Sequence, residues 1–215
     1  LKNYRLEDYR IELVNVGGTS FYPFMHLFNS SKNEKAILKP ITILTDNDKF
    51  PKSKRKEFKF EKLILDDYDV LDTLDAEIQD AAPNCRVANL NSVANAQAHI
   101  KIFDAGKTFE YELALANVPK DKNELENNFL FKYIRKKDKN KADNILEYTA
   151  TIDADDWDDA SRRKTAILMW KTITSKGTFA QNFSIYLLKH IKRARKEFEV
   201  PKYILKGLKH LKQGV

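Results

Sequence analysis

Two aspartates, Asp46 and Asp48, follow a run of aliphatic and β-branched residues in the stretch ITILTDND, residues 41–48. Residues two apart on an extended chain point to the same side, so both carboxylates can face one ligand. Carboxylate oxygens suit a hard divalent cation, and Mg²⁺ held by one or two carboxylates is a common partner of phosphate groups. This short motif predicts either a metal site or a polar turn after a strand, and it does not decide between them.

The elements that would position these acids alternate along the chain. Strand-like runs lie at 11–16, 40–46 and 99–106. Helical patterns lie at 20–28, from 108 onward, and at 153–173, 178–197 and 201–212. Strands that alternate with helices predict an α/β fold with a parallel sheet, in which ligands collect at the carboxyl ends of the strands. Asp46, Asp48 and Asp104 all fall at such ends.

Composition points to a folded chain with a charged end. The 215 residues are 42% hydrophobic and 32% charged, and no apolar run reaches the roughly 20 residues of a membrane span. The formal charge is +7, and ten basic residues stand against two acidic ones from Lys176 to the end, so the preceding part is close to neutral. This basic end fits either a polyanion partner or a solvated helix face, and a cytoplasmic location without membrane contact is expected.

Several common catalytic and nucleotide-binding motifs are absent from the sequence. There is no G-x-x-x-x-G-K-[ST] phosphate loop, no G-x-G-x-x-G fingerprint and no G-x-S-x-G nucleophile elbow. The four histidines lack short metal-ligand spacings, and the single cysteine, Cys85, cannot form an internal disulfide. Acidic residues and lysines are therefore the groups left to do chemistry.

Four segments together resemble a known family. VNVGGTSFYPFMHLF, ITILTDND, KTFEYELALA and KGTFAQNFSIYLLKHI…FEVPKYILKGL occur in the order seen in the Toprim nuclease region of OLD (overcoming lysogenization defect) family ATP-dependent endonucleases, the group that includes the Gabija defence nuclease. The resemblance implies a Toprim-like, Rossmann-like parallel sheet with helical insertions and a C-terminal helical extension. It also implies metal-dependent DNA cleavage, a role in defence against phage or other foreign DNA, and assembly into homo-oligomers.

The resemblance assigns roles to four residues. Its D-x-D motif falls on Asp46 and Asp48, and its T-L-E motif falls on Glu110, with Phe109 where leucine is common. These three acids would be ligands of Mg²⁺ or Mn²⁺, in a site that holds two metal ions, and Asp46 would also be catalytic. The K-G-x-F-A motif falls on KGTFA, so Lys176 would contact the cleaved phosphate and stabilise developing charge.

The chain also departs from the family pattern. The family's first Toprim strand ends in a glutamate that acts as a metal ligand or general base, and neither Glu7 nor Glu12 matches it. The chain is therefore expected to be the C-terminal part of a nuclease, incomplete alone. ATP would act through an N-terminal ATPase region or subunit outside this chain.

The expected organisation has three parts. Residues 1–117 would form the Toprim core from its second strand onward, with an insertion at about 52–95. Residues 118–160 would be a charged insertion, and 161–215 would form helices that carry the KGTFA motif and the basic tail.

The remaining predictions concern the basic residues near the C-terminus and two alternative functions. A cluster on a helix near the C-terminus is expected to contact DNA phosphates: Lys192, Arg193, Arg195 and Lys196. A non-catalytic DNA-binding or assembly module stays open as an alternative, as does a phosphatase that uses an aspartyl nucleophile of the D-x-D type.

Overall fold

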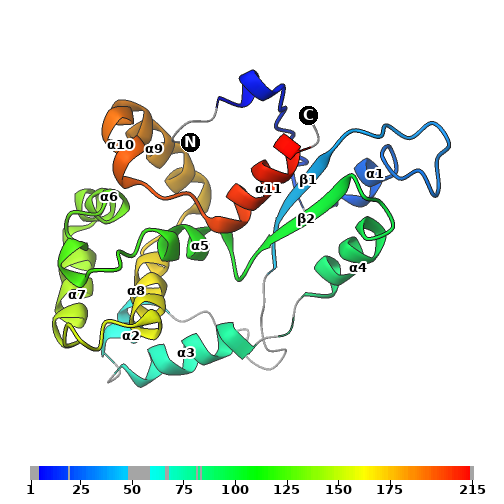
Figure 1. Ribbon diagram of the computed structural model, residues 1–215. Helices are drawn as coiled ribbons and strands as arrows, with labels where there is room; N and C mark the ends of the chain where they lie inside the picture. Colours follow the sequence, from blue (N-terminus) through cyan, green and yellow to red (C-terminus); the bar gives the residue numbers. More distant parts are fainter. Residues whose placement is uncertain are drawn as a thin grey trace. The chain divides into compact units, whose positions relative to one another are not determined.

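The computed structural model describes residues 5–18, 20–47, 59–65, 68–80, 82 and 84–213. It is an α/β structure, mostly helical, with a small parallel sheet (Figure 1). The chain forms two compact units. Unit 1 comprises Leu1–Lys49, Pro83–Lys107 and Lys202–Val215, and unit 2 comprises Phe50–Ala82 and Thr108–Pro201. The stretch 118–160, expected as an insertion, thus belongs entirely to unit 2.

Unit 1 is built on two parallel strands. Strand β1 (Ile41–Asp46) pairs with β2 (Ile100–Ala105) in a register that runs from Ile41 opposite Ile100 to Asp46 opposite Ala105. Both strands lie where the sequence predicts them, because aliphatic and β-branched residues favour a pleated, half-buried position.

Two helices cover the two faces of this sheet. Alternate strand residues, among them Ile43 and Ile100, pack in a small core with Leu90 and Ala94 of α4 (Cys85–Ala94). The other face meets α11 (Lys202–Gln213), where Gly207 lies close to Thr42. Figure 1 shows α4 and α11 on opposite sides of the two strands.

The first part of unit 1 departs from the sequence-based expectation. Residues 11–16 were predicted as a strand, but they form none, and Leu13 and Val14 are 83% and 69% exposed. Within the described ranges this segment pairs with neither strand, and β propensity alone does not hold a strand without a partner. The helix expected at 20–28 is reduced to α1 (Tyr22–Met25), which has no side-chain N-cap, and the short 3₁₀ helix η1 (Leu6–Tyr9) precedes it.

Unit 2 is helical in its described part. Its helix with the most buried residues is α8 (Asp159–Lys171). The other elements of unit 2 are α2 (Phe60–Leu65), α3 (Asp69–Asp80), α5 (Phe109–Ala116), η2 (Lys122–Glu124), α6 (Phe129–Lys137), α7 (Lys139–Ala150), α9 (Lys176–Lys189) and α10 (Ile191–Glu197). The single helix expected over 178–197 is two helices, because the backbone departs from helical geometry at His190 (φ −118°, ψ 31°).

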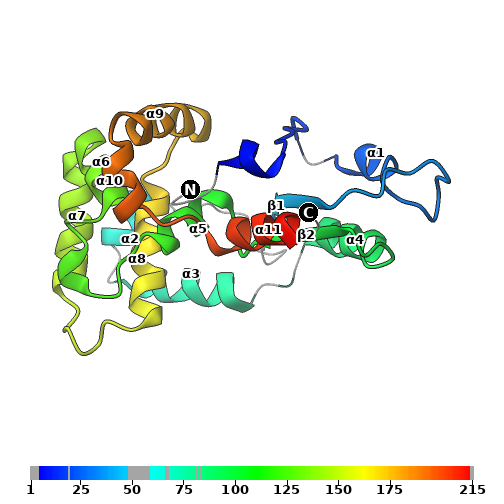
Figure 2. The same ribbon diagram turned by 45° about the horizontal axis from the view of Figure 1, so that its top comes forward.

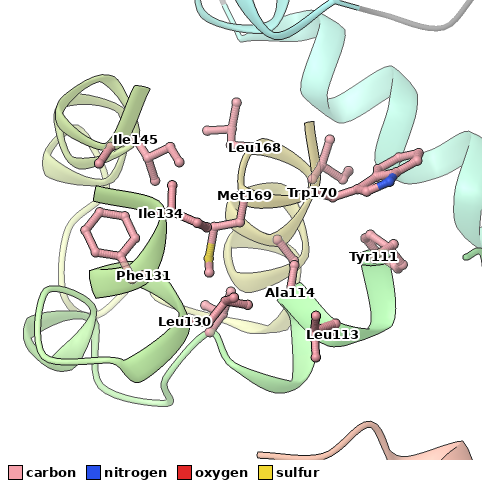
Figure 3. Close-up of a cluster of buried hydrophobic side chains, with 14 of the residues drawn as sticks. Tyr111, Leu113, Ala114, Leu130, Phe131, Ile134, Ile145, Leu168, Met169 and Trp170 are labelled. Atoms are coloured by element: carbon pink, nitrogen blue, oxygen red, sulfur yellow. The ribbon is translucent and has the colours of Figure 1, made fainter. Parts of the chain in front are cut away.

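Helix α8 is the centre of the unit 2 core. Its residues from Thr165 to Trp170 are buried all round the helix, as expected of a helix enclosed by others. Figure 3 shows Leu168, Met169 and Trp170 among side chains from α5, α6 and α7, including Leu130 and Ile145. Apolar residues of the charged stretch 118–160 therefore supply much of this core.

Candidate functional site

Asp46 is the last residue of β1, at the carboxyl end where the sequence predicts it. Helix α4 holds this end: the Asn84 side chain caps the helix by accepting from the Arg86 N–H, and Arg86 Nη2 donates to the Asp46 backbone carbonyl at 2.8 Å. The other predicted acid of the pair, Asp48, lies outside the described residues.

The residue between the two acids is a buried connector. Asn47 is 2% exposed, its Nδ2 donates to Asp104 Oδ2 at 2.6 Å, and its Oδ1 accepts from the Asn84 N–H at 2.7 Å. Asp104 stands opposite Thr45 in the parallel register. Because side chains alternate along strands, Asp104 and Asp46 lie on opposite faces of the sheet. Asn47 thus ties together β1, β2 and the start of α4.

In unit 2 the structure brings Glu110 and Lys176 together, although they are far apart in the sequence. Glu110 lies in the first turn of α5, where the Thr108 hydroxyl caps the helix by accepting from the Tyr111 N–H. Lys176 is the first residue of α9. Lys176 Nζ lies 3.1 Å from Glu110 Oε2, with 10% of the Glu110 side chain and 59% of the Lys176 side chain exposed.

The electrostatics of this pair are asymmetric. Partial positive charge at a helix N-terminus favours a carboxylate such as Glu110 and disfavours an ammonium such as Lys176. Glu110 Oε2 is buried and has no partner with hydrogen-bond geometry, so the 3.1 Å contact is a charge pair rather than a hydrogen bond. Lys176 is therefore held by Glu110 at a place of positive potential, where an anion would be attracted.

The basic cluster predicted to bind DNA lies on α10. Lys192, Arg195 and Lys196 are exposed, whereas Arg193 is partly buried and donates from Nε to Glu197 Oε2 at 2.6 Å. The Arg193 guanidinium also lies 5.8 Å from the centre of the Phe129 ring. Three of the four predicted basic residues are thus available to a polyanion, and Arg193 also has a structural role.

A second charge pair in unit 2 joins a buried acid, Asp75, to a half-buried base, Arg163. The Asp75 carboxylate accepts two bonds from Arg163 Nε, at 2.9 and 3.0 Å, and one from Nη2 at 2.9 Å. The hydrogen bond to Asp75 raises the pKa of Arg163, and burial together with the Asp75 charge raises the pKa of Tyr111 well above its usual value. This pair joins α3 to α8, and no sequence motif identifies it.

The predicted metal ligands are distributed over both units. Asp46 belongs to unit 1 and Glu110 to unit 2. Within the described ranges, no three or more His, Cys, Asp or Glu side chains are grouped so that they could hold a metal ion. The described acids are hard oxygen donors of the type that Mg²⁺ and Mn²⁺ take, so they fit the predicted ions in chemistry.

Sequence reasoning did not find Asn47 and Arg86, the residues that hold the β1 end. The sequence signals only their neighbour Asn84, because an asparagine before a helical run is a common N-cap. Comparison with known proteins found no matching family model, no matching curated protein and no matching solved structure. No helix among the described residues is long and apolar enough to cross a bilayer.

Proposed function

We propose that this chain is the Toprim-like part of a metal-dependent DNA endonuclease of the OLD type. The observation that carries the proposal is the Glu110–Lys176 contact at 3.1 Å. The resemblance selected these two residues from separate motifs, and the helices α5 and α9 bring them together in one unit. A pairing of unrelated residues at this distance would be an unexpected coincidence.

The chemistry proposed for Lys176 follows from its position. Its ammonium group is 59% exposed at the start of α9, so a phosphodiester could approach it from solvent. There it would neutralise charge that develops on a phosphate oxygen, without a proton transfer. Glu110 would hold Lys176 in place before the substrate binds.

Asp46, Asp48 and Glu110 would hold Mg²⁺ or Mn²⁺, which when bound would polarise the phosphate and activate a water molecule. Asn47 and Arg86 would keep the end of β1, and with it Asp46, in a fixed position. The exposed bases of α10 would position the DNA by phosphate contacts. The same proposal includes assembly into homo-oligomers, an ATPase region of the same protein or complex, a defence role and a cytoplasmic location.

The test compares Lys176→Ala with Lys189→Ala, which removes an exposed lysine at the other end of α9. The chain is expressed with the upstream region that the resemblance implies, and nicking of supercoiled plasmid is followed across Mg²⁺ and Mn²⁺ titrations. Lys176→Ala should cut about 100-fold or more slowly at saturating DNA, with nearly unchanged affinity. Lys189→Ala should cut like the wild type. Equal rates for the two variants would remove Lys176 from the mechanism.

A non-catalytic DNA-binding module is the second candidate, and the three exposed bases of α10 favour it. Replacing Lys192, Arg195 and Lys196 with alanine should weaken binding to every sequence. It should also reduce the salt dependence of log K by about 0.9 per lost phosphate contact. If this variant binds weakly while wild-type protein shows no metal-dependent cutting, the module explains the chain better than the nuclease. A covalent aspartyl-phosphate on Asp46 would instead support a phosphatase.

A further inference from the structure

An open groove of about 250 Å³ lies in unit 2 between the end of α6 and the start of α9. Helices α6, α9 and α10 lie side by side in both ribbon views, and α10 contacts each of the other two (Figure 1 and Figure 2). Ser175, the residue directly before Lys176, lines the groove. It is therefore adjacent in sequence to the proposed catalytic lysine. Thr178 and Phe179 of the KGTFA motif line the groove, but the proposed mechanism does not use it.

The floor of the groove is aromatic. Tyr133 and Phe179 line it, with ring centres 5.7 Å apart at an angle of 75°. Phe179 is half-buried and also stacks on Phe183, with ring centres 5.4 Å apart. Ile134 and Ile173 add aliphatic sides. A flat ligand with its own π-system would gain most from such a floor, because stacking uses the faces and edges of the rings.

The rim of the groove is polar and carries one cation and one acid, because Lys137 and Asp138 both line it; the Asp138 carboxylate is engaged as the N-cap of α7, accepting from the Lys141 N–H. Ser175 and Thr178 are exposed, with their hydroxyl oxygens 3.0 Å apart, and hydroxyl groups can both donate and accept hydrogen bonds. Asn182 adds a side-chain amide with the same capacity. Lys137 is exposed, and its Nζ lies 5.8 Å from the centre of the Tyr133 ring, so it brings positive charge to the aromatic floor.

The aromatic floor and the polar rim together fit a whole nucleotide better than they fit a free phosphate or an aliphatic ligand. A free phosphate would not use the aromatic floor, and an aliphatic ligand would not use the hydroxyl and amide rim. A nucleobase can stack on Phe179 and bond to the rim, while its own phosphate meets Lys137. A base inside a duplex cannot do this unless it leaves the stack, which costs a few kcal/mol.

We propose that this groove binds one unstacked nucleotide of a DNA strand whose next phosphodiester lies at Lys176. The inference rests on the proposed nuclease function and specifies its substrate. The preferred DNA would be single-stranded, or a duplex with a gap, flap or mismatch that releases a base. Stacking on an aromatic side chain tolerates any sequence, so this site would select the structure of the DNA and not its sequence.

The test measures binding without cleavage, in EDTA, by fluorescence anisotropy. Three labelled probes are used: oligo-dT, an abasic oligonucleotide of the same length and a blunt duplex. Phe179→Leu keeps apolar volume and removes the ring, and Lys137→Gln removes the cation. Lys139→Gln is the matched control, because Lys139 is exposed nearby at the start of α7 and does not line the groove. Circular dichroism checks that each variant is folded.

The expected result is selective. Wild type should bind oligo-dT at least about fivefold more tightly than the abasic strand, and Phe179→Leu should remove that difference, as expected for one lost base–aromatic stack. Lys137→Gln should weaken both single strands, and Lys139→Gln neither. The proposal is overturned if wild type does not distinguish the two strands, or if Phe179→Leu binds both like wild type or weakens both equally. If Phe179→Leu does not fold, Asn182→Ala replaces it and must reduce oligo-dT binding more than abasic binding.

Cleavage assays separate this inference from the function on which it rests. If the protein cuts DNA with metal but the groove variants bind like wild type, the groove inference is wrong and the nuclease proposal stands. If binding depends on the groove while no metal produces cutting, the nuclease proposal is wrong and the nucleotide site stands.

Discussion

Gly207 in α11 is a position where a single added methyl group should loosen the sheet of unit 1. A Cβ at this residue would lie 2.6 Å from Thr42 Cγ2 and 2.9 Å from Leu44 Cδ2. The Thr42 side chain cannot easily move away, because its hydroxyl donates to the Gly207 carbonyl at 3.0 Å. Gly207→Ala must therefore displace α11 from β1 or distort the strand.

The magnitude follows from two opposing effects. Alanine is a better helix former than glycine by about 1 kcal/mol, which favours the variant. Forcing extra volume into a packed contact costs about 1–3 kcal/mol, and both contacts under 3 Å place this site at the upper end. The net loss in the free energy of opening unit 1 should be about 1–2 kcal/mol, so its amides should open about 5- to 30-fold more often.

Amide hydrogen exchange of peptides covering 41–46 and 100–105 measures this opening. Lys206→Ala is the control, because this neighbouring α11 side chain is exposed. Tryptophan fluorescence should not change, since both tryptophans, Trp157 and Trp170, lie in unit 2. Exchange in Gly207→Ala that is equal to or slower than wild type would refute the packing of α11 on the sheet.

Three other substitutions test the polar contacts. Arg163→Met should leave the buried Asp75 carboxylate with only the 3.4 Å hydrogen bond from Gln79 and lower the stability of unit 2 by about 3 kcal/mol, measured by urea unfolding with tryptophan fluorescence. Asn47→Ala should remove the partner of Asp104 and speed exchange at the end of β1 by about tenfold, corresponding to roughly 1.4 kcal/mol. Asp158→Ala removes the α8 N-cap and should cost about 1 kcal/mol at neutral pH. Hydrogen bonds to this cap lower the pKa of Asp158, so its stabilising effect is full above the usual aspartate pKa of about 3.9 and is lost as the pH falls through the lower folded-state pKa. The difference between wild type and Asp158→Ala in urea midpoints should therefore shrink in acid, and a constant difference would exclude this role for the carboxylate.

The parts of the fold that the sequence predicts are those fixed by local pattern. Strands β1 and β2 and helix α5 all lie at or near the predicted positions, because short-range periodicity determines them. The strand expected at 11–16 is wrong, because a strand also needs a partner, which the local pattern does not show. The charged stretch 118–160 shows a second limit of local pattern, since its lysines and acids obscure the regularly spaced apolar residues of α6 and α7.

In the candidate site, too, local motifs predict some residues, whereas others depend on the whole fold. Motif resemblance identified Glu110 and Lys176, and the structure brings them to 3.1 Å, although their roles stay predictions. Asn47 acts through contacts with residues distant in sequence, so no local pattern distinguishes it from an ordinary loop asparagine. Nothing in the sequence indicates that Lys107 is 1% exposed. Spacing predicts which residues share a face, whereas burial and partners depend on the whole fold.

Unit 1 is assembled from three separated stretches, and α11 is made after all of unit 2. During synthesis β1 and β2 therefore exist for about a hundred residues without the helix that covers one face of their sheet, at a usual rate of about 5–20 residues per second. Unit 2, which is continuous from Thr108 to Pro201 apart from its first helices, can form its core during that interval. A stop codon or a protease cut just before Lys202 would spare the helical unit and leave Thr42, Leu44 and Phe103 uncovered, so the sheet of unit 1 would be the part that aggregates.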